Sequence, residues 1–124
     1  LTNASQPRCN YEFIGWDDRT GIGGSNPMAA DGEPYRVYNS LITRAVRELA
    51  LALNATGATA KATHYSSTAD GFAAKIQQAQ PLASFHVHSA AHATNAGIFD
   101  TAASQAAIFS SVSMQLQSLQ RHWL

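Results

Sequence analysis

The clearest periodic pattern in this chain is PYRVYNSLITRAVRELALAL, at residues 34–53. Its apolar residues recur at intervals of three and four, with charged residues on the other faces, so the segment predicts an amphipathic helix. Pro34 suits the first turn of such a helix, and Gly57 suits a left-handed cap just past its end. The apolar positions are Tyr38, Leu41, Ile42, Ala45, Val46, Leu49 and Leu53.

Three other segments have the alternation that is typical of β-strands. Residues 10–16 are rich in aromatic side chains, and residues 59–65 place threonine, lysine and tyrosine against alanine and histidine. Residues 84–90 alternate Phe85 and Val87 with two histidines, and the first pair should be buried. We therefore expect one strand before the helix and two after it.

Two further helices complete the pattern. Residues 66–68 offer an N-cap, helical spacing follows over residues 70–79, and Pro81 stops the segment. Apolar residues at helical intervals also fill the end of the chain, which predicts a long last helix that begins near Asn95 or at an Asp100 cap.

The resulting order, β-α-β-α-β-α, predicts the α/β (α+β) class, as a small two-layer sandwich of three to four strands and about three helices. The alternative is an all-α domain. With 124 residues the chain fits a single domain, 1–124. Within it we expect residues 1–9 to be a flexible lead-in and residues 17–33 to be a glycine-rich surface loop.

The charge balance excludes some classes of partner. Eight Lys and Arg residues stand against eight Asp and Glu residues, so no net charge attracts nucleic acid or an anionic membrane. The apolar runs are far shorter than the roughly 20 residues that span a bilayer. The weakly charged composition, and a first residue, Leu1, that fits removal of a signal segment, lead us to expect a secreted, extracellular protein.

Cys9 is the only cysteine, so no disulfide can form within one chain. In an exported protein it is a candidate for an interchain disulfide, and the alternative is a buried, inert thiol. Asn3 and Asn54 each begin an Asn-x-Ser/Thr triplet, which makes both of them candidates for glycosylation.

Four histidines form the strongest candidate site in the sequence. His86 and His88 would point to the same side of a strand, and His92 or His64 could supply the third nitrogen that zinc and copper sites use. No carboxylate or cysteine lies nearby at ligand spacing. Histidines that titrate independently, or together as an acid-sensitive cluster, therefore remain alternatives to a metal site.

Motifs of common enzymes are missing from the sequence. The glycines that follow Trp16 lack the pattern of a phosphate loop, and no Gly-x-Ser-x-Gly elbow occurs. We therefore expect a secreted non-enzymatic interaction protein, such as a toxin or effector subunit, that binds a second chain, another copy of itself or a target surface. This hypothesis needs no cofactor. The alternative is a small metal-binding protein or metal-dependent enzyme that holds zinc or copper on the histidines.

Overall fold

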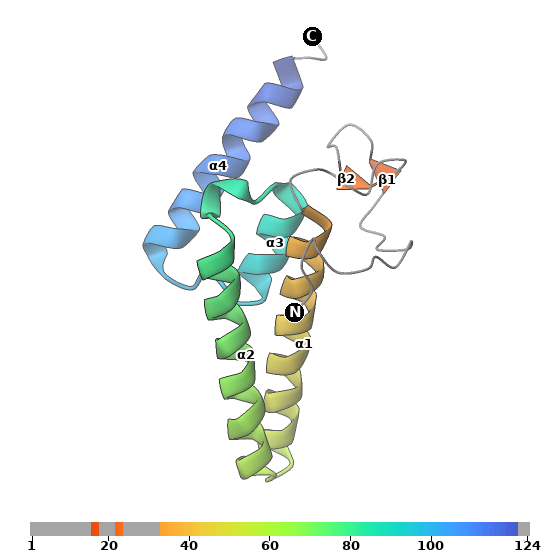
Figure 1. Cartoon of the computed structure of the whole chain (residues 1–124), viewed down its shortest axis with the longest axis vertical. Coiled ribbons are helices and arrows are strands. Elements are labelled where there is room, and N and C mark those ends of the chain that lie inside the picture. Colours follow the sequence, from red (N-terminus) through yellow and green to blue (C-terminus); the bar gives the residue numbers. More distant parts are fainter. Residues whose placement is uncertain (1–15, 18–21, 24–32, 122–124) are drawn as a thin grey trace.

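The computed structural model of the chain describes residues 16–17, 22–23 and 33–121 (Figure 1). Residues 33–121 are almost entirely helical, because four α-helices and one 3-10 helix follow one another with short connections. The helical elements are α1 (Glu33–Ala55), α2 (Thr59–Ala79), the 3-10 helix η2 (Leu82–Ser84), α3 (Val87–Asn95) and α4 (Ala102–Arg121).

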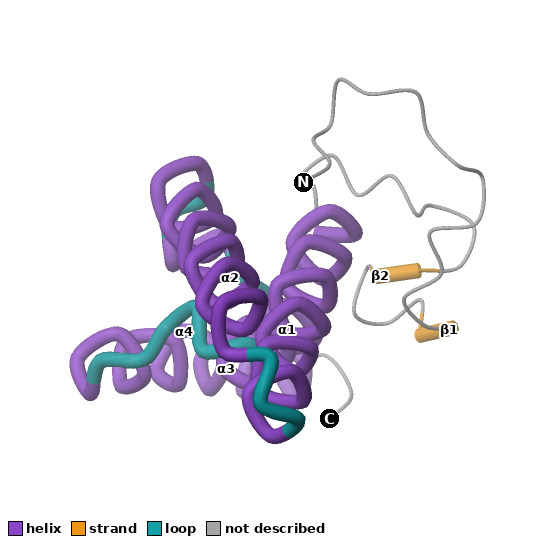
Figure 2. Tube along the Cα trace, turned by 90° about the horizontal axis from the view of Figure 1, so that it is seen from below, coloured by secondary structure: helices purple, strands orange, loops and turns teal. Residues whose placement is uncertain are grey.

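The helices form two parts: a long hairpin of α1 and α2, and a second part, called the corner here, in which η2, α3 and the start of α4 meet the end of α2. Helices α1 and α2 run antiparallel as a long hairpin, and α3, η2 and α4 gather at the end of that hairpin that lies away from its turn (Figures 1 and 2). Helix α4 then extends beyond the corner, so that its second half projects from the other helices (Figure 1). No helix in the described part of the chain is long and apolar enough to cross a membrane.

The helices predicted at residues 34–53 and at the end of the chain are confirmed as α1 and α4. Gly57 has φ +80° and its N–H donates a 3.1 Å hydrogen bond to the Asn54 carbonyl, so it closes α1 as predicted. The cap of α4 lies one residue beyond Asp100, because Thr101 Oγ1 accepts a 3.1 Å hydrogen bond from the backbone N–H of Ser104.

The strand predicted at residues 59–65 is wrong, because these residues form the first turns of α2. Ala60, Lys61 and Ala62 are good helix formers, and an alternation over only seven residues does not exclude a helix. The helix predicted after residues 66–68 is real, but it begins at Thr59 and runs without a break to the predicted end before Pro81. Its buried residues keep a helical period, with Ala62, Ala69, Ala73 and Ile76 turned inward.

The strand predicted at residues 84–90 is also wrong. Phe85 is buried as predicted, but it follows η2 as its C-cap, and Val87 begins α3 and is only half-buried. The backbone N–H of His86 donates to Ser89 Oγ at 3.0 Å, which satisfies one polar group at the start of the helix. His86 and His88 therefore lie at the beginning of a helix and not on one face of a strand.

The strand predicted at residues 10–16 lies almost wholly outside the described residues, as do the lead-in at 1–9 and most of the loop at 17–33. From these regions the structure describes β1 (Trp16–Asp17) and β2 (Ile22–Gly23), which pair antiparallel over two residues each. Helices cannot form a layer on so small a pair. The α/β sandwich is therefore wrong, and the all-α alternative fits the described residues.

The core lies in the corner, where the end of α2 meets η2, α3 and the start of α4. The fully buried Phe85 ring packs edge to face on Phe99, with 5.1 Å between their centroids. Gln115 Nε2 donates to the Phe85 carbonyl at 3.1 Å, and Gln77 Nε2 donates to the carbonyl of Ile98. The core residues are Ala73, Ile76, Phe85, Ala90, Ala93, Ala96, Ile98, Phe99 and Ile108.

Candidate functional site

The side of α1 that carries its large apolar residues is turned away from the other described helices. Tyr38 is 44% exposed and Leu49 is 43% exposed. In both views the side of α1 opposite α2 faces no described helix, only the short strands β1 and β2, of which β2 contacts α1 (Figures 1 and 2). We call this surface the outer face of α1. It consists of the exposed Tyr38, Leu41, Ala45, Leu49 and Ala52 and the half-buried Ile42, Val46 and Leu53.

The opposite side of α1, its inner face, is buried and polar. Ser40 Oγ donates to the Arg36 carbonyl at 2.7 Å, and Thr43 Oγ1 donates to the Asn39 carbonyl at 2.8 Å, so both buried hydroxyls are satisfied within the helix. The buried Arg36 guanidinium also lies 5.9 Å from the centroid of the Phe85 ring. Helix α1 buries Tyr35 and Val37 near its start, but from Asn39 onward its buried side chains are polar or small, and most of its large apolar residues lie outside this packing.

The size of the side chains explains why α1 turns its polar side inward. The inner face presents small residues such as Ser40 and Ala50, and α2, which packs along α1, buries small residues such as Ala62 and Ala69. The distance between two packed helices depends on the side chains at the contact, so small residues on both helices let the hairpin close tightly. The larger residues of the outer face would hold the two helices further apart.

Arg47 joins the hairpin to the corner. Its Nη1 donates to the carbonyls of Ala96 at 2.7 Å and Gly97 at 2.8 Å, and its Nη2 lies 2.9 Å from the Asp70 carboxylate on α2. Gly97 has φ +65°, and a Cβ at this position would overlap with Arg47 Nη1. One side chain of α1 therefore connects α1, α2 and the turn before α4.

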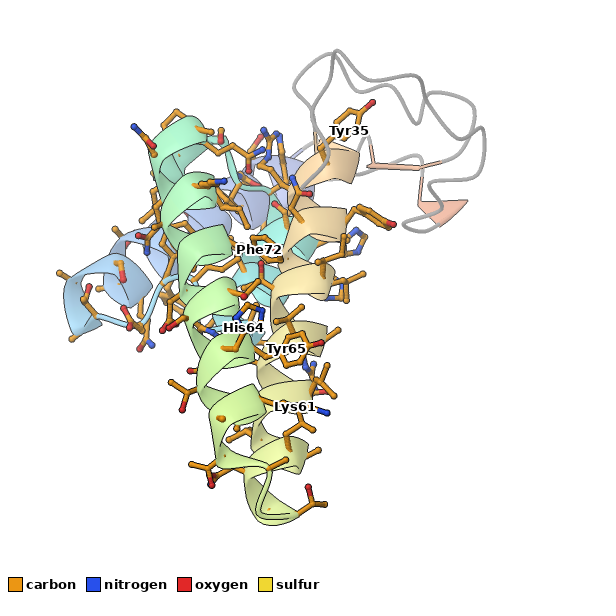
Figure 3. The ribbon with its side chains drawn as sticks, turned by 60° about the horizontal axis from the view of Figure 1, so that its bottom comes forward. Tyr35, Lys61, His64, Tyr65 and Phe72 are labelled. Carbon is orange, nitrogen blue, oxygen red and sulfur yellow. The ribbon has the colours of Figure 1, made fainter. Side chains whose placement is uncertain are left out.

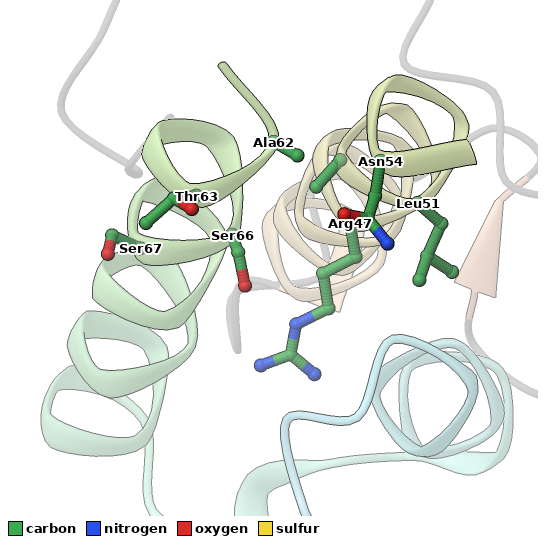
Figure 4. Close-up of a pocket in the computed structure, with 8 residues that line it drawn as sticks. Arg47, Leu51, Asn54, Ala62, Thr63, Ser66 and Ser67 are labelled. Atoms are coloured by element: carbon green, nitrogen blue, oxygen red, sulfur yellow. The ribbon is translucent and has the colours of Figure 1, made fainter. Parts of the chain in front are cut away.

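A groove of about 460 Å³ lies beside Arg47, between α1 and α2 (Figure 4). Its polar groups are hydroxyls, one amide and the Arg47 guanidinium, which already binds two carbonyls and a carboxylate. The guanidinium of Arg47 therefore already has partners within the fold, and the other polar groups of the groove are neutral. The groove is lined by Arg47, Ala50, Leu51, Asn54, Ala62, Thr63, Ser66 and Ser67.

A second, more apolar groove of about 560 Å³ runs between α3 and α4. Val87 and Ala90 line its α3 side, and Ile108 and Val112 line its α4 side. Phe109 lies at its edge and is 73% exposed. Ala90 and Ile108 belong both to the core of the corner and to the lining of this groove. The groove is therefore a second apolar area, formed by α3 and α4 and not by α1.

The histidines predicted as metal ligands are spread over two helices. His64 is exposed on α2, where its ring meets Tyr65 edge to face at 5.3 Å (Figure 3), while His88 and His92 lie one turn apart on α3. Over residues 16–17, 22–23 and 33–121, no three His, Cys, Asp or Glu side chains are grouped as metal ligands. The geometric argument for zinc or copper required His86 and His88 on a strand, and that premise is wrong. Metal binding itself stays a prediction.

Two of the other predicted sites, Cys9 and Asn3, lie outside the described residues, so the interchain disulfide and glycosylation at Asn3 stay predictions. Asn54 is exposed in the last turn of α1, and the neighbouring Thr56 Oγ1 donates to the Leu53 carbonyl at 2.9 Å. Glycosylation at Asn54 is also untested.

The outer face of α1 was not among the sites predicted from the sequence, although its residues other than Ala52 were recognised as the apolar side of a helix. The periodicity located these residues on one side, but it carried no information on which side would pack. Searches with the chain matched no protein-family model, no curated protein and no solved structure.

Proposed function

We propose that this chain is a non-enzymatic interaction protein that binds a protein partner through the outer face of α1. The observation that carries the proposal is the reversed packing of this helix. Ser40 and Thr43 are fully buried, whereas Tyr38 and Leu49 lie on the exposed side.

The outer face has the composition of a helix-binding surface. All of its side chains are apolar apart from the hydroxyl of Tyr38, and the charged Arg44 and Glu48 lie along one edge. Soluble proteins rarely expose such a continuous apolar surface unless it binds a partner. A partner helix that lies along α1 would bury these residues in the same manner as the second helix of a coiled coil.

Other parts of the proposed biology rest on composition alone. Export from the cell and a role as a toxin or effector subunit stay predictions, since no structural feature of the described residues bears on them. The interaction itself is supported by the exposed side chains of α1 and does not depend on those predictions.

Native mass spectrometry of the protein from its natural source tests this function. We expect an assembly of defined mass, heavier than the single chain, that survives reduction and is lost in a Leu49→Glu variant expressed in the same host. The matched control is Leu51→Glu, because Leu51 is 71% exposed but lies outside the outer face.

Two outcomes would contradict the function. A wild-type protein that is monomeric in its natural source and stays monomeric when it is concentrated has no partner. An assembly that Leu49→Glu and Leu51→Glu leave equally intact uses a different surface of the chain.

A further inference from the structure

The outer face of α1 contains a regular seam of the kind that pairs helices. Tyr38, Ile42, Ala45, Leu49 and Ala52 follow one another at intervals of four, three, four and three residues. These are the intervals between the central positions of a coiled coil, where side chains of one helix fit between those of another. Large and small residues alternate along the seam from Ile42 to Ala52.

We propose that this seam binds the same seam of a second copy of the chain, with the two α1 helices antiparallel. This inference rests on the proposed function and names its partner. When the two helices are centred near Arg47, Ile42 lies level with Ala52 of the second copy, and Ala45 lies level with its Leu49. We call each pair of residues that lie level with one another a layer. Each layer then contains one large and one small side chain, so the space between the helices is filled evenly.

A parallel pair of α1 helices would lack this fit. In register, it would place Ile42 beside Ile42 and Ala45 beside Ala45, so that overfilled layers would alternate with empty ones. The alternation of large and small residues therefore favours the antiparallel arrangement.

The charges at the edge of the outer face also suit a second copy. Arg44 Nε and Glu48 Oε1 are 2.7 Å apart in one chain, and their side chains remain 47% and 59% exposed. In the antiparallel pair, Glu48 of each chain lies within one turn of both Arg44 and Glu48 of the other chain, so two arginines and two glutamates gather at this edge and their charges balance. The chain as a whole carries no net charge, so two copies do not repel each other at long range.

The seam is short, which sets the expected strength of the dimer. From Ile42 to Ala52 it extends about 15 Å along the helix axis at about 1.5 Å per residue. Stable coiled coils run over several heptads, so we expect a dissociation constant on the order of micromolar and a dimer in exchange with monomer.

Analytical ultracentrifugation of the purified full-length chain tests the pairing over a range of concentrations. For this experiment the Cys9→Ser substitution is introduced into the wild-type chain and into every variant, so that a disulfide cannot produce the dimer. We expect a monomer–dimer equilibrium whose dissociation constant rises at least tenfold in Leu49→Glu and stays within about twofold of wild type in Leu51→Glu. Circular dichroism verifies that both variants remain helical.

A volume exchange tests the antiparallel register. Ala45→Leu places two large side chains in one layer and should weaken the dimer at least tenfold. The double variant Ala45→Leu/Leu49→Ala restores one large and one small residue per layer, and we expect its dissociation constant to return to within about threefold of wild type. A double variant that is as weak as Ala45→Leu overturns this register.

The remaining outcomes separate this inference from the proposed function. A chain that stays monomeric at all concentrations, while the protein from its natural source is assembled, overturns self-pairing and leaves a different protein as the partner. A monomer whose melting temperature falls in Leu49→Glu but not in Leu51→Glu shows that the outer face stabilises the chain's own fold, and both proposals then fail. A monomer that sediments with phospholipid vesicles also overturns self-pairing.

Discussion

The corner and helix α1 bury different kinds of side chain. In the corner, aromatic and aliphatic residues such as Phe85, Ile98 and Phe99 are turned inward, as hydrophobic burial requires. In α1, Ser40 and Thr43 are turned inward while most of the large apolar residues lie outside. The two regions are therefore stabilised in different ways. Removal of apolar area from water stabilises the corner, and α1 is held by close packing and hydrogen bonds that leave its apolar side for a partner.

The largest expected effect comes from the corner. Phe85→Ala removes a fully buried ring that contacts Phe99 and Arg36, and we expect it to lower the free energy of unfolding by about 3–5 kcal/mol. The control is Phe109→Ala, which removes a ring that is 73% exposed and should change the same quantity by less than about 0.5 kcal/mol. Urea denaturation measures both values. Equal losses would show that stability does not reside in the corner.

An intermediate effect is expected where Arg47 joins the two regions. Gly97→Ala forces a side chain into a left-handed conformation and displaces Arg47, so we expect a loss of about 2–3 kcal/mol. Gly57→Ala is the matched control, because Gly57 also has positive φ but no atom lies within 4 Å of an added Cβ, and about 1 kcal/mol should be lost. Similar losses in thermal or urea unfolding would mean that the Arg47 contacts add nothing.

The smallest effect is expected at Asp70. Its side chain is 67% exposed, so the ion pair with Arg47 is screened by water, and Asp70→Asn should cost less than about 1 kcal/mol in urea denaturation. Arg47→Met should cost more, about 1–3 kcal/mol, because the carbonyls of Ala96 and Gly97 lose their donor. The reverse order would show that the charge, and not the carbonyl contacts, connects α1 to the corner.

The places where sequence interpretation failed share one physical cause. Residues 59–65 and 84–90 each span only seven positions, and over so short a stretch neither alternating alanine nor the alternation of Phe85 and Val87 with histidine distinguishes a strand from a helix. The period that distinguishes them extends further, through Ala69, Ala73 and Ile76 in α2 and through Ala90 and Ala93 in α3. Longer windows could have found both helices. The distribution of the four histidines over two helices follows directly from this correction.

The sequence by itself determined the amphipathic helix at residues 34–53, its glycine cap and the last helix, because these features depend on local periodicity and backbone conformation. Only the tertiary structure decided which side of α1 would be buried. That choice depends on whether the side chains of the neighbouring helix are small enough for it to pack closely on the side of α1 that carries Ser40 and Thr43. It also depends on whether Arg47 reaches the carbonyls of Ala96 and Gly97. These contacts join residues up to 50 positions apart, so no local pattern contains them.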